Sequence, residues 1–128
     1  MKFLLDTHTF IWWVTDDPQL STIARDTIAN PNNTILFSVI NGWEIVIKQG
    51  TGKLTLPEPA ETYIPSRITA NRFIILPVHL SHILQVASLP NLHRDPFDRL
   101  LVAQSQVENI PIISVDRYII QYPVNVIW

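Results

Sequence analysis

The sequence predicts one α/β domain over residues 1–128, built on a mainly parallel sheet of four to five strands sandwiched by helices. Short apolar runs alternate along the chain with helical patterns, which is typical of successive βα units. The runs are continuous rather than alternating, as expected for strands buried on both faces. With 128 residues, 47% of them hydrophobic, the chain is long enough for one compact core and too short for two ordinary domains.

Five segments are predicted as strands. The first four are short, continuous apolar runs, and the last is predicted as an edge strand. In chain order they are residues 3–5, 35–37, 73–76, 112–113 and 124–127. A helix with Phe10, Ile11 and Val14 on one face is expected directly after the first strand.

Capping residues predict where the next helices begin and end. Ser21 is a candidate N-cap for a helix through Ile28. Ser38 is a candidate N-cap for a helix through Lys48, which the Gly50-Thr51-Gly52 turn ends. Both helices therefore follow directly from local sequence.

The second half of the chain predicts two further helices. One begins near Ser81 and has an apolar face made of Ile83, Leu84, Val86 and Ala87. The clearer one begins at Asp95-Pro96, because Asp suits the N-cap and Pro suits the first helical position. Between residues 57 and 71, Pro65 is expected to break or kink any helix.

Composition excludes several classes of protein. The formal net charge is -2, so the chain lacks the basic footprint of a typical nucleic-acid-binding protein. It has no cysteine, which excludes disulfides and thiolate metal sites and suits a reducing compartment. No apolar run approaches the ~18–20 residues that span a bilayer. We therefore expect a cytoplasmic protein without a membrane segment.

Four acidic residues fall at positions that a parallel sheet brings together. Asp6 directly follows the first predicted strand, and Asp116 follows the strand near residue 113. Glu44 lies on the helix after the second strand, and Asp98 lies in the first turn of the helix that begins at Asp95. Because the carboxyl ends of parallel strands meet at one edge, the four carboxylates are predicted to converge there.

Converging carboxylates raise one another's pKa unless a cation neutralises them. Sites made only of oxygen ligands suit Mg²⁺ or Mn²⁺, which bind through one or two carboxylates together with water and substrate phosphates. Such an ion activates water and offsets the charge that develops during attack on a phosphodiester. The spacing thus favours a metal-dependent phosphodiesterase site.

Structural roles compete with this interpretation. Asp6 and Asp116 are also ordinary turn or cap residues, and Asp95 and Asp98 suit the start of a helix. Glu44 and Lys48 have the spacing of an ordinary surface ion pair on a helix. Spacing alone leaves a metal site and these structural roles equally open.

Four segments carry a family resemblance that covers the chain from end to end. They are Leu4-Leu5-Asp6-Thr7-His8-Thr9-Phe10-Ile11-Trp12-Trp13, Trp43-Glu44-Ile45-Val46-Ile47-Lys48, His93-Arg94-Asp95-Pro96-Phe97-Asp98-Arg99-Leu100-Leu101-Val102-Ala103-Gln104 and Ile113-Ser114-Val115-Asp116. In order and spacing they resemble PIN-domain nucleases of the VapC toxin type. The third segment is the most specific of the four.

The resemblance implies a PIN-like nuclease domain over residues 1–128 and a toxin-type endoribonuclease that uses Mg²⁺, with Mn²⁺ as the alternative ion. It also implies a cognate antitoxin and a homodimer. Asp6, Glu44, Asp98 and Asp116 match the family's acidic set, and Asp6 and Asp98 are the expected direct ligands. The chain departs from the pattern at Asn41-Gly42, and the glycine is expected to weaken the helix that carries Glu44.

Two alternatives remain open at this level. A haloacid dehalogenase-like phosphatase would use Asp6 as nucleophile, but it needs a second acid where His8 stands. A catalytically inactive RNA- or protein-binding module is the other. Among the remaining conspicuous residues, His79 and His82 are predicted to be surface residues, and the four tryptophans are predicted to serve the core.

Overall fold

The computed structural model describes residues 1–128 and contains one five-stranded parallel sheet in the order β3-β2-β1-β4-β5. The strands are β1 (Lys2–Leu5), β2 (Thr34–Ser38), β3 (Ile74–Leu76), β4 (Ile112–Ile113) and β5 (Val126–Ile127). The helices are α1 (Thr7–Val14), α2 (Thr22–Ala29), α3 (Val39–Gly50), α4 (Ala60–Ala70), α5 (Leu80–Val86), α6 (Pro96–Glu108) and the short 3₁₀ helix η1 (Ile119–Gln121). The predicted fold class is confirmed.

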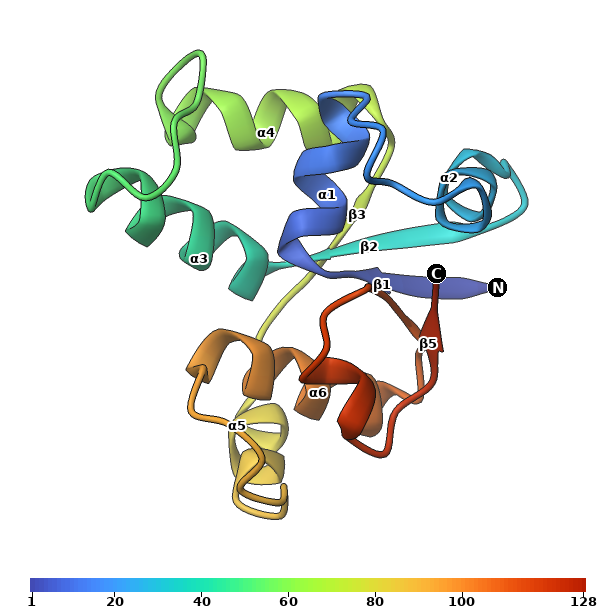
Figure 1. Cartoon of the computed structure of the whole chain (residues 1–128), viewed down its shortest axis with the longest axis vertical. Helices are drawn as coiled ribbons and strands as arrows, with labels where there is room; N and C mark the ends of the chain where they lie inside the picture. Colours follow the sequence, from blue (N-terminus) through green and yellow to red (C-terminus); the bar gives the residue numbers. More distant parts are fainter.

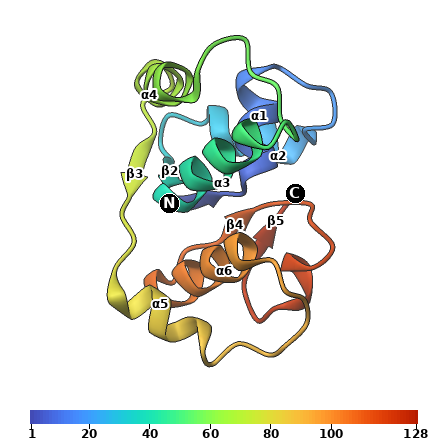
Figure 2. The ribbon, with the colours of Figure 1, turned by 90° about the vertical axis from the view of Figure 1, so that its left-hand side faces the viewer.

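Helices cover both faces of the sheet, so the strands are buried between two apolar layers. Helices α1 to α4 lie on one side, and α5 and α6 lie on the other (Figures 1 and 2). Leu5 and Phe37 contribute to the larger cluster with α1, α2, α3 and α4. Leu4 and Leu36 contribute to the second cluster with α6. Alternate side chains of a strand thus pack into opposite cores, which explains the continuous apolar runs.

Three predicted helix caps are present. The Ser21 hydroxyl accepts a hydrogen bond from Ala24 N at 3.0 Å. Ser38 Oγ accepts one from Ile40 N at the start of α3, and Asp95 caps α6. Because each bond joins residues two or three positions apart, local sequence is enough to predict it.

Pro65 was expected to break or kink a helix, and α4 nevertheless runs through it from Ala60 to Ala70. Pro65 is exposed, whereas Ala60, Tyr63 and Ile68 of the same helix are buried in the core. The missing amide donor therefore lies on the solvent side, and burial of the opposite face holds the helix together.

The predicted burial of α5 is wrong. Ile83 and Leu84, expected on the core side, are 52% and 62% exposed. His82, expected at the surface, is fully buried. Its Nδ1 accepts a hydrogen bond from His79 N at 3.0 Å, and its Nε2 lies 3.3 Å from Glu108 Oε2 on α6. A polar side chain occupies the buried position because it finds partners for both ring nitrogens.

The tryptophans divide between core and surface. Trp12, Trp13 and Trp128 pack partly buried against the larger core, as predicted, but Trp43 on α3 is half exposed. No helix combines the length and the apolar character that crossing a membrane requires.

Candidate functional site

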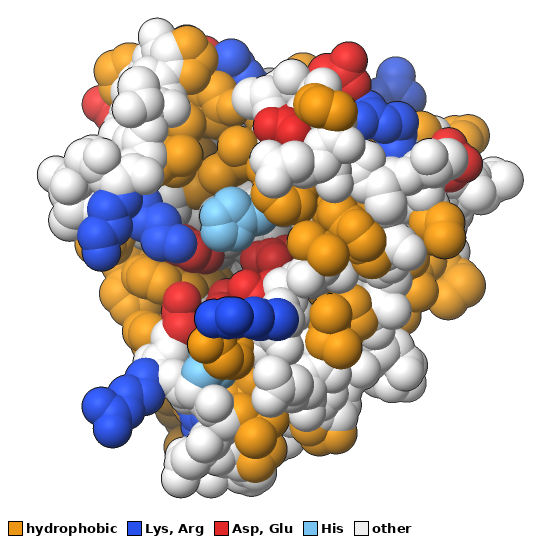
Figure 3. Space-filling model, viewed as in Figure 1, with side chains coloured by type: hydrophobic (Ala, Val, Ile, Leu, Met, Phe, Trp, Pro, Cys, Tyr) orange, Lys and Arg blue, Asp and Glu red, His pale blue; other side chains and the backbone are white.

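The predicted acidic residues lie at the carboxyl edge of the sheet, around neighbouring strands β1 and β4. Asp6 directly follows β1, and Asp116 lies three residues beyond β4. From β1 the sheet extends to β2 on one side and to β4 on the other, which makes this edge a topological switch point. Figure 3 shows acidic side chains gathered in a hollow on this face, with histidine and basic side chains beside them.

Asp6 occupies the N-cap position of α1, yet its side chain makes no capping hydrogen bond. The carboxylate is buried, and its Oδ2 accepts a hydrogen bond of 2.7 Å from Ser114 Oγ. The pKa of Asp6 is raised to about 6: burial is the largest cause, Glu44 and Asp116 also raise it, and Ser114 and His8 oppose the rise. A simple cap role does not account for this placement.

Asp98 lies in the first turn of α6 with a side chain that is only 13% exposed. Burial, as the largest cause, and the charges of Asp95, Asp6, Asp116 and Glu44 together raise its pKa to about 8. Its Oδ2 lies 3.2 Å from His93 Nε2.

Glu44 is buried on α3 and paired with Lys48 one turn later. The pair is therefore not the ordinary surface ion pair that its spacing permits. Burial lowers the pKa of Lys48, but the hydrogen bond and charge of Glu44, together with Asp95 and Asp98, outweigh this and leave the pKa raised. Lys48 thus lies within electrostatic reach of the acids on α6 as well.

Asn41 anchors the start of the helix that carries Glu44. Its Oδ1 accepts a hydrogen bond of 2.8 Å from Ser38 N, and its Nδ2 donates one of 3.0 Å to Thr7 Oγ1. The buried amide thereby joins the beginnings of α3 and α1, next to Glu44 and Asp6. At Gly42 a side-chain Cβ would meet only the Phe37 ring, at 3.6 Å, and α3 is continuous through this position.

Asp116 has a structural role that the sequence left open. Its Oδ1 accepts hydrogen bonds from Tyr118 N at 2.8 Å and Ile119 N at 3.1 Å, which holds the turn into η1. Ser114, which sequence reasoning did not single out, donates to Asp6 and accepts from Asp116 N at 3.0 Å. The signals for Ser114 were its place in the Ile113-Ser114-Val115-Asp116 segment and a hydroxyl two residues before an acid at the end of a strand.

Asp95 acts as a cap. Its Oδ1 accepts hydrogen bonds from Phe97 N at 2.9 Å and Asp98 N at 3.1 Å. The bond to Asp98 N also fixes the backbone from which the Asp98 side chain projects. Asp95 therefore supports the acidic edge through the geometry of α6.

The acidic edge fits a divalent cation by charge and donor type. No three ligating side chains gather around one point, but Mg²⁺ is commonly bound through one or two carboxylates and several waters. Asp6 and Asp98 are oxygen donors that burial destabilises in their charged forms. A cation beside them would offset that cost, since it favours the ionised carboxylate.

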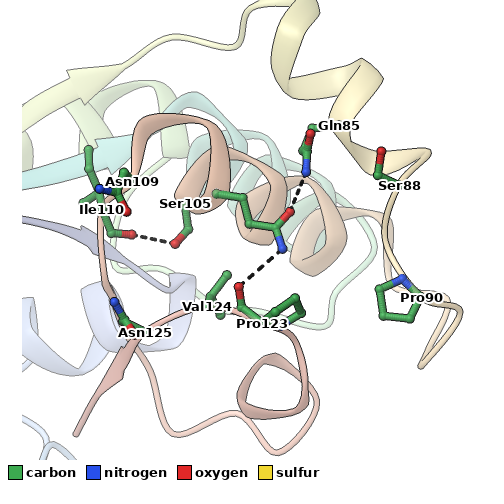
Figure 4. A pocket seen from close by; sticks show the side chains of 10 residues that line it. Gln85, Ser88, Pro90, Ser105, Asn109, Ile110, Pro123, Val124 and Asn125 are labelled. Carbon is green, nitrogen blue, oxygen red and sulfur yellow. Dashed lines mark hydrogen bonds between the residues drawn. The ribbon is translucent and has the colours of Figure 1, made fainter.

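A separate pocket of about 580 Å³ lies at the opposite, amino ends of β4 and β5 (Figure 4). Its polar groups are largely paired with one another: Gln85 Nε2 donates to Gln106 Oε1 at 2.8 Å, and Gln106 Nε2 donates to Pro123 O at 3.4 Å. It contains no ionisable side chain. The lining residues are Gln85, Ser88, Pro90, Ser105, Gln106, Asn109, Ile110, Pro123, Val124 and Asn125.

Known proteins resemble this chain in sequence and in fold. Over 44 residues, 34% of the chain, it is 41% identical to Ribonuclease VapC16 of Mycobacterium tuberculosis, and the match spans about a third (31%) of that relative's length. The fold is similar to that in the VapBC2 structure from Rickettsia felis, bound to a promoter DNA fragment, with a TM-score of 0.73, 17% identity and coverage of 98% of this chain and 97% of that one. It is also similar to VapBC-1 from nontypeable Haemophilus influenzae, with a TM-score of 0.66, 19% identity and coverage of 94% and 91%.

The sequence resemblance to PIN-domain proteins is thus confirmed in sequence and in fold. At these identities the two solved structures speak for the fold alone. The family itself is shown by the sequence, because the PIN domain family matches residues 3–125. With nearly its whole length inside that match and its acidic residues at the carboxyl edge of the sheet, the chain belongs to the PIN domain family.

Proposed function

We propose that this chain is a divalent-metal-dependent endoribonuclease that acts as the toxin of a toxin–antitoxin pair. The observation that carries the proposal is the pair of carboxyls of buried Asp6 and largely buried Asp98, whose pKa values are both raised by desolvation and by the charges of other acids. Buried carboxyl groups that repel one another are typical of a site built to hold a cation. The name of the M. tuberculosis relative, a ribonuclease, supports the choice of RNA as substrate.

In this proposal Asp6 and Asp98 are the direct ligands of Mg²⁺ or Mn²⁺, and Glu44 and Asp116 complete the catalytic acids. When bound, the ion supplies a water of lowered pKa and neutralises charge as that water attacks a phosphodiester in line. Ser114 holds Asp6 Oδ2 in place, which leaves Oδ1 for the cation. The hydrolysis needs no covalent intermediate on the protein.

Lys48 supports a role for the same edge in binding a phosphate backbone. Its amine pairs with buried Glu44, and its side chain remains about one-third exposed. The Lys48 ammonium, at the rim of the acidic hollow, would attract the anionic substrate, while Glu44 fixes the position of the ammonium group. The proposal includes a cytoplasmic location, where such an RNA substrate is available.

The proposal is tested by incubating the purified protein with total cellular RNA in Mg²⁺, in Mn²⁺ and in excess chelator. We expect cleavage only with a metal ion. Asp6→Asn should lower the cleavage rate by at least about a hundredfold, because loss of a ligand costs more than the 10–100-fold typical of outer groups. Asp26→Asn, which changes an exposed acid on α2, is the matched control and should cleave normally.

Full activity in Asp6→Asn would overturn the site assignment. RNA binding without cleavage by the wild-type protein would favour the inactive binding module instead. Expression without an antitoxin in a bacterial host tests the toxin part, since the wild-type protein should stop growth and Asp6→Asn should not. Normal growth with active wild-type protein would refute the toxin role.

A cognate antitoxin is the proposed partner, because two structures similar to this chain are VapBC assemblies. An apolar groove of about 710 Å³ lies between α3 and α4 and includes half-exposed Trp43, Val39 and Val46. Trp43 contacts Phe97 on α6, with ring centroids 4.8 Å apart, directly beside Asp98. An antitoxin segment in this groove would therefore reach the acidic edge, where an arginine pairs well with carboxylates.

We also propose a homodimer. Helix α5 exposes Leu80, Ile83 and Leu84, and the edge strand β3 before it exposes Ile74 and Ile75. In Figure 2, β3 and α5 follow one another along the same side of the molecule. An unpaired strand edge next to exposed aliphatic side chains is a surface that a second copy can cover.

A further inference from the structure

The Asp98 carboxylate ends a chain of hydrogen bonds. Its other members are not among the four acids described above. Arg99 Nη1 donates to the Tyr122 hydroxyl at 3.0 Å. The same hydroxyl lies 2.7 Å from His93 Nδ1, and His93 Nε2 lies 3.2 Å from Asp98 Oδ2. Four side chains from three parts of the sequence are thereby joined in one line.

We propose that Arg99, Tyr122 and His93 form a relay that fixes the orientation of Asp98, with His93 as a positioning residue for the metal ligand. The role of Asp98 as a metal ligand rests on the proposed function. The relay itself rests on the geometry alone. It assigns roles to His93 and Arg99 beyond those of the acidic residues.

The direction of the hydrogen bonds follows from the chemistry of the two ends. A guanidinium only donates, so the Tyr122 oxygen accepts from Arg99 and its own proton is free for His93 Nδ1. An ionised carboxylate only accepts, so His93 must carry its proton on Nε2, facing Asp98. Both ends therefore select the same tautomer of neutral His93.

Packing holds the imidazole in this orientation. The His93 side chain is only 9% exposed, and its ring stacks on Tyr118 with centroids 4.8 Å apart and an interplanar angle of 11°. Tyr122 is buried, and Arg99 is also tied to Pro90 O at 2.8 Å. The chain is therefore held at each member rather than only at its ends.

A relay of this kind fixes which oxygen of Asp98 remains free. With Oδ2 engaged by His93, Oδ1 is the atom left to ligate a cation at the acidic edge. Partners behind a metal ligand set its orientation and basicity, and their loss typically costs 10–100-fold in metal affinity or activity. The relay is expected to act on metal affinity before it acts on fold stability.

The first test needs no substitution. Nitrogen-15 NMR of the metal-free wild-type protein at pH 9, where Asp98 is ionised, should find His93 as the Nε2–H tautomer. Tyr122→Phe keeps the ring and removes the hydroxyl, so it should leave His93 in a mixture of tautomers. Tyr118→Phe is the matched control, because it keeps the stacked ring and removes a hydroxyl that contacts Arg117 rather than His93. It should retain the wild-type tautomer.

The second test measures binding of Mn²⁺ alone, by the electron paramagnetic resonance signal of the free ion. Tyr122→Phe should weaken Mn²⁺ binding about tenfold and His93→Ala by 10–100-fold, while Tyr118→Phe should bind as wild type does. Thermal unfolding of each metal-free variant separates this effect from a loss of fold. A role in stability alone would lower the unfolding temperature and leave the affinity of the folded protein unchanged.

Two outcomes would overturn the relay: an Nδ1–H tautomer in the wild-type protein, or wild-type Mn²⁺ affinity in both His93→Ala and Tyr122→Phe. Failure of the proposed function looks different. In that case the wild-type protein binds no Mn²⁺ and cleaves no RNA, while the tautomer of His93 still reports whether the relay exists.

Discussion

Individual carboxyl groups in this protein have different roles, although they are close in sequence or in space. Asp95 accepts two backbone hydrogen bonds and acts as a cap, whereas Asp98 faces four other acids and has a raised pKa. Asp116 holds a turn, and Asp6 sits at a cap position without capping. Residue type and spacing predicted Asp6, Asp98 and Asp116 as acids of one edge and Asp95 as a cap. Their hydrogen-bond partners distinguish structural from candidate catalytic roles.

The raised pKa values of Asp6 and Asp98 predict how the stability of the metal-free protein depends on pH. In the unfolded chain both carboxyls lose their protons near the ordinary pKa of 3.8. In the folded protein Asp6 keeps its proton up to about pH 6 and Asp98 up to about pH 8. The unfolded state then binds fewer protons, so the free energy of unfolding falls as pH rises through this window. Urea denaturation in a chelator at pH 5, 6.5 and 8 measures the slope.

Asp98→Asn removes the larger contribution, so its free energy of unfolding should depend less on pH and should exceed that of the wild type at pH 8. The gain should be at least about 1 kcal/mol, because one pKa unit corresponds to about 1.4 kcal/mol. Asp26→Asn, at an exposed position, should keep the wild-type slope. Identical slopes for Asp98→Asn and wild type would contradict the raised pKa.

At the scale of the element, helix α6 connects the acidic edge to the core. Asp95 and Pro96 define its start, Asp98 projects from its first turn, and Leu101 and Val102 pack into the second core cluster. Because the cap and the acid share one turn, the position of Asp98 depends on where the helix begins. Likewise, the position of Glu44 depends on where α3 begins, and the hydrogen bonds of Asn41 with Ser38 and Thr7 fix that start.

Substitution of Asp95 separates capping from metal binding. Asp95→Ala should lower the free energy of unfolding by about 1 kcal/mol, since two backbone amides lose their acceptor. Asp95→Asn keeps an oxygen for the cap and removes the charge, so it should restore most of that stability. Chemical denaturation and RNA cleavage are measured on both variants. A loss of cleavage in Asp95→Asn as large as that in Asp98→Asn would identify Asp95 as a ligand instead.

For the whole molecule, the two exposed apolar surfaces lie on elements that flank the site rather than in it. The groove between α3 and α4 meets the acidic edge at Trp43, and the α5 surface lies on the other side of the sheet. The two surfaces meet at their edges, because Ile75 of β3 also lines the groove and because Trp43 and Ile83 line one small pocket together.

The α5 surface is the basis of the prediction for oligomeric state. The wild-type protein should be a dimer at micromolar concentration in sedimentation equilibrium. Leu84→Glu should weaken the dimer at least about tenfold, because the burial of one leucine side chain is worth about 1.5–3 kcal/mol. Ile23→Glu, at an isolated exposed position on α2, is the control and should leave the dimer intact. A monomeric wild-type protein at this concentration would rule out the dimer.

Local interactions account for what the sequence determined by itself. The order of the strands and helices, the caps at Ser21, Ser38 and Asp95, and the placement of Asp6 after β1 depend on residues a few positions apart. Chain order with a parallel sheet was enough to bring the acids to one edge. These features were predicted because backbone hydrogen bonding and apolar periodicity act over short distances.

Tertiary packing decided the rest. Nothing local distinguishes buried His82 from exposed Leu84 on α5, because the face a helix buries depends on the partner it packs against. Ser114 meets Asp6 across 108 residues, and Tyr122 meets His93 across 29, so both contacts exist only once the strands and η1 are in place. The sequence therefore determined which acids line the edge. The folded chain decided which of them are buried, how they are oriented and which have a raised pKa, because desolvation and hydrogen-bond geometry arise only from packing.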